Sequence, residues 1–116
     1  MLSATDHKRL DRAVALAALS DVKQKHGCLI VSGGRVLSVG INAYTSRNRR
    51  SSTHAEIAAL RAVPEDVNLK TATLYVARIS KGGSVAMSRP CANCQEAMKR
   101  RGIKKVVYTI DRSLTI

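Results

Sequence analysis

Residues 71–110 read TATLYVARISKGGSVAMSRPCANCQEAMKRRGIKKVVYTI and place one helix between two apolar strands. The runs 71–79 and 105–110 are rich in apolar and β-branched residues, which favour buried strands. Residues 91–101 predict a helix, because a proline comes directly before this run and a glycine directly after it. A turn and a short returning strand are expected at 81–87. Strands that alternate with helices predict an α/β fold.

The residues before this segment extend the same alternation. Residues 5–22 carry apolar side chains at helical spacing, with Thr5 or Asp6 as the expected N-cap. Two apolar runs flank Gly33 and Gly34, a dipeptide typical of a two-residue hairpin turn. The expected elements are helices at 5–22 and 54–63, strands at 27–32 and 35–41, and a polar, basic loop at 44–53.

The predicted order of elements is therefore α-β-β-α-β-α-β. Apolar strands that alternate with helices imply a sheet covered on both faces, so we expect a three-layer α/β/α sandwich. A chain of 116 residues is too short for a second core of ordinary size, and we expect a single domain over 1–116.

Composition restricts the partners and the compartment. Twenty Lys and Arg against eight Asp and Glu give a net charge of +12, which favours an anionic partner, either nucleic acid or a phosphorylated small molecule. Aromatic residues are 3% of the chain, all Tyr, which argues against an aromatic platform for stacked bases. No apolar run approaches the roughly 20 residues of a membrane span. Three cysteines, an odd number, favour a reduced compartment and a cytoplasmic location.

Two short segments carry the candidate chemistry, and each stands at the expected start of a helix. One reads HAE from His54, and the other reads PCANC from Pro90. Cys91 and Cys94 are three apart on a helix, so their sulfurs share one face and can bind one ion. The partial positive charge of a helix N-terminus favours thiolates. Two thiolates and one imidazole leave a fourth zinc position open for water, as in catalytic rather than structural sites.

Glu56 follows His54 by two residues, near enough to reach water held by such an ion. Zinc-bound water ionises near pH 7, and a carboxylate can pass its proton to a departing amine, as hydrolytic deamination requires. The pattern H-x-E followed by P-C-x-x-C is the signature of zinc deaminases. We therefore expect one Zn²⁺ per chain on His54, Cys91 and Cys94, with Glu56 as the catalytic residue.

Each motif alone has a simpler interpretation. A lone C-x-x-C is also found in redox pairs and in half of a structural zinc site, and a lone HAE is usually a surface turn. The two together favour a catalytic site, because the chain has no second C-x-x-C to close a structural one. His7 and His26 lie outside any ligand spacing and are interpreted as solvated or packing residues. Cys28, within an apolar run, is interpreted as a small buried hydrophobic residue.

The motifs resemble those of the cytidine deaminase-like superfamily, in particular its deoxycytidylate and tRNA-adenosine deaminase branches. The similar segments span nearly the whole chain: GCLIV, GRVLSVGIN, THAEIAAL, TLYV, SRPCANC and GIKKVVY. The resemblance implies a minimal version of the cytidine deaminase-like fold, with the zinc ligands and the proton shuttle named above. It also implies that Asn42 hydrogen-bonds the sugar or base of the substrate and that the backbone N–H of Ala55 holds the carbonyl of the base. Members associate as dimers, tetramers or hexamers, so we expect a homo-oligomer.

The chain departs from this family before its second motif. Fourteen residues, 76–89, separate Tyr75 from Pro90, whereas relatives usually cross this interval in a few residues. The extra hairpin is expected at the substrate mouth or at an oligomer contact. Met87, Ser88 and Arg89 replace the acidic or aromatic neighbours of relatives, so a particular substrate specificity does not carry over directly.

Positive charge next to the HAE motif bears on the substrate. Arg47, Arg49 and Arg50 lie in the loop before His54 and are candidate phosphate ligands. The first hypothesis is deamination of cytosine in a nucleotide such as deoxycytidylate (dCMP). The second is deamination of cytosine or adenine within single-stranded DNA or RNA. The third is a zinc-stabilised nucleic-acid-binding domain without activity, which the presence of Glu56 disfavours.

Overall fold

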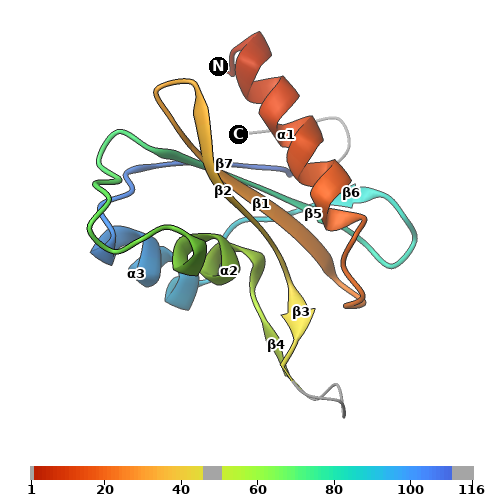
Figure 1. Ribbon diagram of the computed structural model, residues 1–116. Helices are drawn as coiled ribbons and strands as arrows, with labels where there is room; N and C mark the ends of the chain where they lie inside the picture. The colour runs from red at the N-terminus through yellow and green to blue at the C-terminus, as the bar shows by residue number, and fades with distance from the viewer. Residues whose placement is uncertain (1, 46–50, 111–116) are drawn as a thin grey trace.

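The computed structural model describes residues 2–45 and 51–110 (Figure 1). The helices in this part of the chain are α1 (Ala4–Ala17), α2 (Ala55–Ala62) and α3 (Ala92–Arg100). The strands are β1 (Lys25–Ser32), β2 (Arg35–Ile41), β3 (Ala43–Tyr44), β4 (Ser52–Thr53), β5 (Thr73–Ile79), β6 (Val85–Ala86) and β7 (Lys105–Tyr108). The predicted order of helices and main strands is confirmed.

The main sheet is mixed, and its strands run in the order β2-β1-β5 with two further strands beyond β5. β1 is antiparallel to both of its neighbours, and it pairs with β5 from Lys25 opposite Ile79 to Val31 opposite Thr73. Because β1 occupies one edge of β5 along its whole length, β6 and β7 divide the other edge. β7 runs parallel to the first half of β5, and β6 pairs antiparallel with its last two residues.

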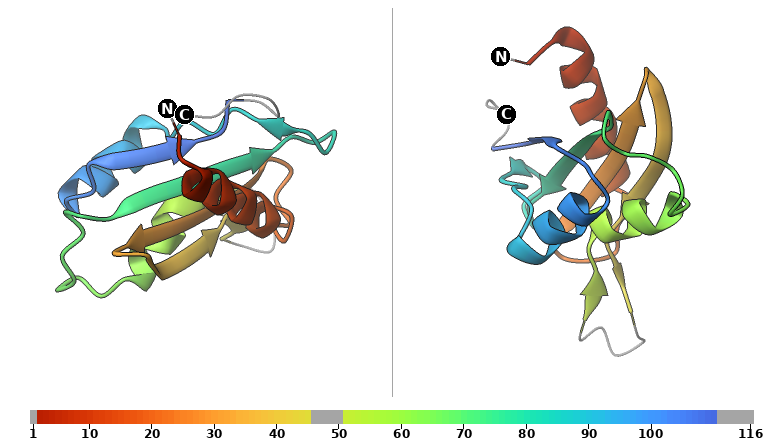
Figure 2. Two further views of the ribbon diagram at one scale, coloured as in Figure 1. Left: turned by 90° about the horizontal axis from the view of Figure 1, so that it is seen from above. Right: turned by 90° about the vertical axis from the view of Figure 1, so that its left-hand side faces the viewer.

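Helices cover both faces of this sheet (Figure 2). α1 lies on one face, where Leu10 and Ala13 pack with Leu29 and Tyr75. α2 and α3 lie on the other face over a second and larger cluster of buried residues, which includes Ile30, Leu74 and Met98. The predicted three-layer α/β/α sandwich is confirmed. None of the helices described is long and apolar enough to cross a bilayer.

α1 is shorter than the sequence predicts and starts earlier. Its N-cap is Ser3, not Thr5 or Asp6: the Ser3 hydroxyl accepts from the Asp6 N–H at 3.0 Å, while the Asp6 carboxylate accepts from the Ser3 N–H at 3.2 Å. The helix ends at Ala17 rather than near residue 22, because Ser20 turns away and donates its hydroxyl to the carbonyl of Asn42 at 2.7 Å.

The region predicted as a loop at 44–53 contributes two short strands. Tyr44 pairs with Ser52, and Ala43 with Thr53, so β3 and β4 form a separate two-stranded ribbon that leads directly into α2. Arg47, Arg49 and Arg50 lie outside the described residues.

Glycines let the helices approach the sheet closely. A Cβ on Gly40, at the end of β2, would lie 2.4 Å from the Ala55 carbonyl oxygen and 2.6 Å from the Ala59 nitrogen. A Cβ on Gly27 of β1 would lie 2.2 Å from the Ala13 carbonyl oxygen. Glycine at residue 40 therefore sets the position of the first turn of α2, where the HAE motif lies.

Candidate active site

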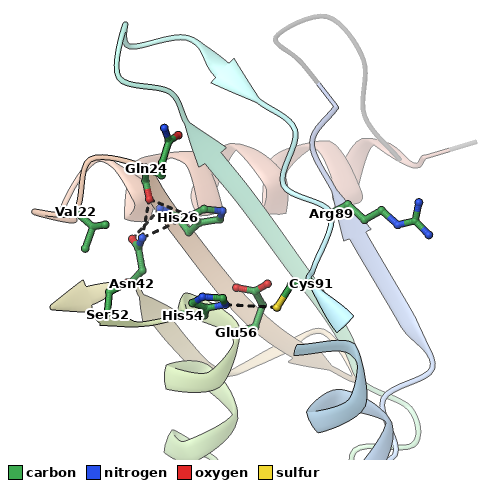
Figure 3. A pocket seen from close by; sticks show the side chains of 9 residues that line it. All are labelled: Val22, Gln24, His26, Asn42, Ser52, His54, Glu56, Arg89 and Cys91. Atoms are coloured by element: carbon green, nitrogen blue, oxygen red, sulfur yellow. Dashed lines mark hydrogen bonds between the residues drawn. The ribbon is translucent and has the colours of Figure 1, made fainter. Parts of the chain in front are cut away.

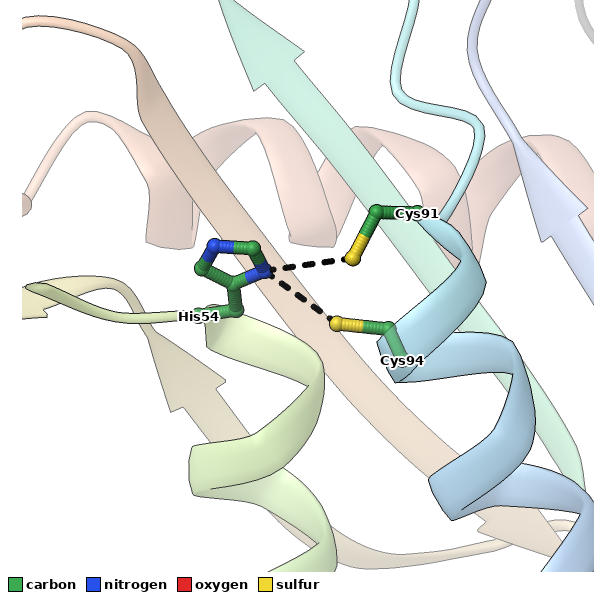
Figure 4. A group of neighbouring side chains, drawn as sticks. All are labelled: His54, Cys91 and Cys94. Atoms are coloured by element: carbon green, nitrogen blue, oxygen red, sulfur yellow. Dashed lines mark hydrogen bonds between the residues drawn. The ribbon is translucent and has the colours of Figure 1, made fainter.

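The two predicted motifs meet at the N-termini of α2 and α3 (Figure 4). His54 is the N-cap of α2 and Cys91 is the N-cap of α3, and neither side chain makes a capping hydrogen bond. Cys94 lies one turn into α3 and is buried. The His54 Nδ1 atom is 3.2 Å from the Cys94 Sγ atom and 3.7 Å from the Cys91 Sγ atom. Two residues that begin helices are therefore free to act as ligands.

The donor set fits a zinc ion. One ligand atom from each of His54, Cys91 and Cys94 lies within 4.8 Å of the others. Zinc bonds of about 2.1 Å to nitrogen and 2.3 Å to sulfur place tetrahedral ligand atoms about 3.6 Å apart, which is close to the two distances that involve Nδ1. One imidazole and two thiols are three of the four ligands that zinc takes, as in catalytic zinc sites.

The surroundings of Cys94 make a lone thiolate unfavourable. Burial raises the pKa of the Cys94 thiol well above its ordinary value, and the nearby Glu56 carboxylate raises it further. Burial likewise raises the pKa of Cys28, with smaller contributions from Glu56 and Cys94. A cation bound between His54 and the two sulfurs would reverse this preference at Cys94, because it stabilises the charged sulfur directly.

Glu56 is a buried carboxylate at the base of a pocket (Figure 3). Its residue is only 4% exposed, yet it lines a pocket of about 310 Å³. In Figure 3 its carboxylate lies between His54 and Cys91. The pocket is lined by Val22, Gln24, His26, Asn42, Ser52, His54, Glu56, Arg89 and Cys91. The carboxylate therefore faces the same pocket as two of the three candidate ligands.

Asn42 lines this pocket, and its side chain is engaged by the neighbouring strand. Its Oδ1 atom accepts from the His26 N–H at 2.8 Å, and its Nδ2 atom donates to the Gln24 carbonyl at 2.6 Å. Asn42 thus fastens the end of β2 to the start of β1. Ala55, the other residue implied in substrate binding, is buried in the first turn of α2, where backbone N–H groups have no partner within the helix.

Five pocket residues were not singled out as site residues from the sequence, and two of them, His26 and Arg89, have ionisable side chains. His26 is half-buried and lines the pocket, whereas its isolated position in the sequence indicated only a solvated or packing residue. Arg89 is exposed at the pocket mouth, directly before the PCANC motif. A charged residue next to a ligand motif is a signal that could have identified Arg89. No local signal identifies His26, because it reaches the pocket only through the pairing of β1.

Two buried hydroxyl groups hold in place the segment that directly precedes the PCANC motif. The Ser88 hydroxyl donates to the Val76 carbonyl at 2.8 Å and accepts from the Thr109 N–H at 2.8 Å. The Thr109 hydroxyl donates to the Ala86 carbonyl at 2.7 Å. The 76–89 segment is thereby tied to the end of β7, and it delivers Arg89 and then Cys91 to the pocket.

Comparisons with known proteins identify the family of this chain. Residues 3–110 match the family model described as the cytidine and deoxycytidylate deaminase zinc-binding region. Comparison with curated protein sequences finds no match.

Solved structures share the fold at low sequence identity. The dCMP deaminase of the cyanophage S-TIM5 in apo form is 21% identical, with a TM-score of 0.75 over 95% of this chain and 86% of that one. The same enzyme in complex with dCMP and dUMP is 20% identical, with a TM-score of 0.72 over 93% and 82%. A cytidine deaminase from Burkholderia pseudomallei is 18% identical, with a TM-score of 0.69 over 95% and 85%.

The family model covers nearly the whole chain, and it includes both motifs that meet at the helix N-termini. This chain therefore belongs to the family of the cytidine and deoxycytidylate deaminase zinc-binding region.

Proposed function

We propose that the chain is a zinc-dependent hydrolytic deaminase that acts on cytosine in a nucleotide such as dCMP and releases the uracil product and ammonia. One observation carries this proposal: the carboxylate of Glu56 faces the same pocket as His54 and Cys91, beside a donor set that fits zinc. A purely structural zinc site has no use for a buried carboxylate in an open pocket.

Zinc on His54, Cys91 and Cys94 would supply a water molecule that ionises near pH 7. Glu56 takes the proton of the attacking water and delivers it to the amine as the amine leaves the ring. Burial of Glu56 suits this role, because it keeps the carboxylate in one orientation and limits competing solvent.

Other residues orient the substrate in this proposal. The backbone N–H of Ala55, at the positive end of α2, holds the carbonyl oxygen of the base. Asn42 contacts the sugar or base through the second N–H of its amide, since the first one is bound to Gln24. Arg47, Arg49 and Arg50 hold the phosphate. Similarity to a dCMP deaminase that was solved with dCMP and dUMP supports a nucleotide substrate.

A base within single-stranded DNA or RNA is the second candidate substrate, and a specific surface favours it. Arg89 lines the pocket of Glu56 and also a second pocket of about 430 Å³, which includes Lys99, Lys104 and Tyr108. A flanking nucleotide on this second surface would place its phosphate among three cations. The net charge of +12 also suits a polynucleotide.

Metal content and the role of Glu56 can be tested together. The purified protein is expected to carry about one zinc per chain, and Glu56→Ala should keep that zinc while it abolishes ammonia release. Glu96→Ala, a change at an exposed glutamate of α3 that pairs with Arg100, should keep both properties. Loss of zinc in Glu56→Ala would contradict the assigned role of a proton carrier that does not bind the metal.

A substrate panel then decides between the candidates. dCMP, cytidine and single-stranded oligonucleotides that contain cytosine or adenine are offered to the zinc-loaded protein, and ammonia release is followed. Turnover of dCMP supports the first candidate. Turnover of oligonucleotides alone overturns it in favour of the second. Tight oligonucleotide binding without turnover of any substrate would indicate a binding domain instead.

A further inference from the structure

The imidazole of His26 presents one ring nitrogen to the pocket. His26 lies near the start of β1 and lines the same space as Glu56 and Asn42 (Figure 3). Its Nδ1 atom is 3.0 Å from the Gln24 carbonyl oxygen. Its Nε2 atom, at the opposite side of the ring, has no hydrogen-bond partner in the part of the chain that the structure describes.

The contact with Gln24 determines which nitrogen carries the proton. A carbonyl oxygen only accepts hydrogen bonds, so Nδ1 donates across this 3.0 Å contact. The Asn42 Nδ2 atom lies farther from the same ring nitrogen, at 3.5 Å, and donates to the Gln24 carbonyl at 2.6 Å, so the shorter contact assigns the proton to Nδ1. In a neutral imidazole, a protonated Nδ1 leaves Nε2 with a free lone pair. Burial lowers the pKa of His26 and outweighs the hydrogen bond to Gln24 and the charge of Glu56, which both act in the opposite direction, so the neutral ring is favoured near pH 7.

The backbone holds this acceptor in place. The His26 N–H donates to Asn42 Oδ1 at 2.8 Å, and the Asn42 N–H donates to the His26 carbonyl at 3.3 Å. Asn42 therefore uses most of its polar atoms to position the residue beside it, whereas His26 keeps an unused acceptor directed to the substrate space. Of these two neighbouring residues, His26 is therefore the one that offers the substrate a free hydrogen-bond acceptor, its Nε2 atom.

We propose that His26 is a specificity-determining residue whose Nε2 atom accepts a hydrogen bond from a sugar hydroxyl of the nucleotide. The inference rests on the proposed deaminase function. A cytosine nucleotide has two kinds of neutral donor, the exocyclic amine and the sugar hydroxyls. The amine is attached to the carbon that is attacked and is engaged beside Glu56 at the zinc ligands. The hydroxyls remain for an acceptor elsewhere in the pocket.

The test compares substrates that differ only in their hydroxyls. Wild type, His26→Ala and His26→Gln are assayed with CMP, dCMP and 2′,3′-dideoxy-CMP. We expect wild type to prefer the nucleotide that carries the relevant hydroxyl by about 3- to 10-fold in kcat/KM, mostly through KM. His26→Ala should lose this preference, and His26→Gln should restore part of it, because the glutamine oxygen can reach the position of Nε2. The CMP to dCMP ratio reports on the 2′-hydroxyl, and the dCMP to dideoxy-CMP ratio on the 3′-hydroxyl.

His7→Ala is the matched control, since His7 is exposed on α1, and it should leave both ratios unchanged. Ratios in His26→Ala equal to those of wild type would overturn the proposal.

A readout without turnover separates this outcome from failure of the proposed function. In ¹⁵N NMR spectra at pH 7, the Nε2 atom of His26 should be unprotonated, and UMP, which carries both sugar hydroxyls, should shift it more than 2′,3′-dideoxy-UMP does. A protonated Nε2, or equal shifts, would contradict the assignment whether or not cytosine is deaminated.

Discussion

The chemistry of each cysteine depends on its neighbours. Cys28 and Cys94 are both buried, and burial raises the pKa of both thiols. Only Cys94 has a second cysteine and an imidazole nitrogen close to its sulfur. A cation can therefore stabilise the Cys94 thiolate, whereas Cys28 remains a neutral packing residue.

This difference predicts opposite results for two equivalent substitutions. Cys94→Ala should lower the zinc content from about one ion per chain to near zero, because two ligands do not hold the ion tightly. Cys28→Ala should keep the zinc and cost about 1–2 kcal/mol of unfolding free energy, through a small cavity. Metal analysis of the dialysed protein measures the zinc content, and urea unfolding measures the unfolding free energy. Full zinc in Cys94→Ala would contradict the ligand assignment.

Asp6 and Tyr75 form a buried pair between α1 and β5 that should make stability depend on pH. The Tyr75 hydroxyl donates to the Asp6 carboxylate and, with the Ser3 contacts, lowers its pKa from the ordinary 3.8. A carboxyl with a lowered pKa in the folded state contributes stability that is present above about pH 4 and is lost as pH falls through the folded pKa. In urea unfolding, the free energy of unfolding should fall less between pH 6 and pH 3 for Asp6→Asn than for wild type. Asp11→Asn, a change at an exposed position of the same helix, should behave as wild type does.

At the level of elements, two helices carry the candidate site, and both are anchored at their far ends as well. The Arg101 guanidinium, just after α3, donates to the carbonyls of Leu60 at 2.8 Å and Val63 at 3.1 Å. These carbonyls lie at the end of α2, and the Leu60 carbonyl also accepts from the Val63 N–H at 3.1 Å. One side chain thus joins the two helices whose N-termini hold the ligands, and it restricts their relative movement.

The close approach of α2 to β2 predicts a coupled loss of stability and metal binding. Gly40→Ala places a methyl group 2.4 Å from the Ala55 carbonyl oxygen, so α2 must shift and move His54 and Glu56 with it. We expect a cost of about 1–3 kcal/mol in unfolding free energy, together with weaker zinc binding in a chelator competition. Gly82→Ala has open space around the new methyl group and should change stability by less than about 0.5 kcal/mol. Unchanged zinc affinity in Gly40→Ala would show that the position of α2 does not control the site.

At the scale of the whole molecule, the edge strand β2 carries three of the large apolar side chains that are exposed among the described residues: Val36, Leu37 and Val39. Leu37 and Val39 alternate on the face that α1 covers, yet they are 37% and 42% exposed, because α1 lies over β1 and β5. No strand pairs with the outer edge of β2 within residues 2–45 and 51–110. An unprotected edge with apolar side chains favours association with another chain.

We accordingly expect a homo-oligomer, as the family resemblance also implies. Light scattering coupled to size exclusion should give a multiple of the 12.5 kDa chain mass. Val39→Lys should shift the mass toward that of one chain without loss of fold, because a charge on the apolar edge opposes association. Leu19→Lys, a change at a residue 68% exposed after the end of α1, should leave the mass unchanged. A monomer at all concentrations would contradict the expectation.

Local pattern alone was enough to predict most elements and both motifs. Apolar periodicity, Pro64, Pro90 and Gly102 indicate where helices and strands lie, since these signals act over a few residues. The spacing of Cys91 and Cys94 was likewise enough to predict that their sulfurs lie close together, because residues three apart share one face of a helix. The early end of α1 was not predictable in this way, since Ser20 turns toward Asn42, which is distant in the sequence.

The amino-acid sequence by itself therefore determined the layered architecture and the donor set at the two helix N-termini, because both follow from short-range periodicity and from side-chain chemistry. Tertiary structure alone decided which residues form the walls of the pocket. His26 reaches it, and the amide of Asn42 is turned toward β1, through strand pairings between distant segments. Such pairings depend on the packing of the whole sheet, which no local pattern encodes.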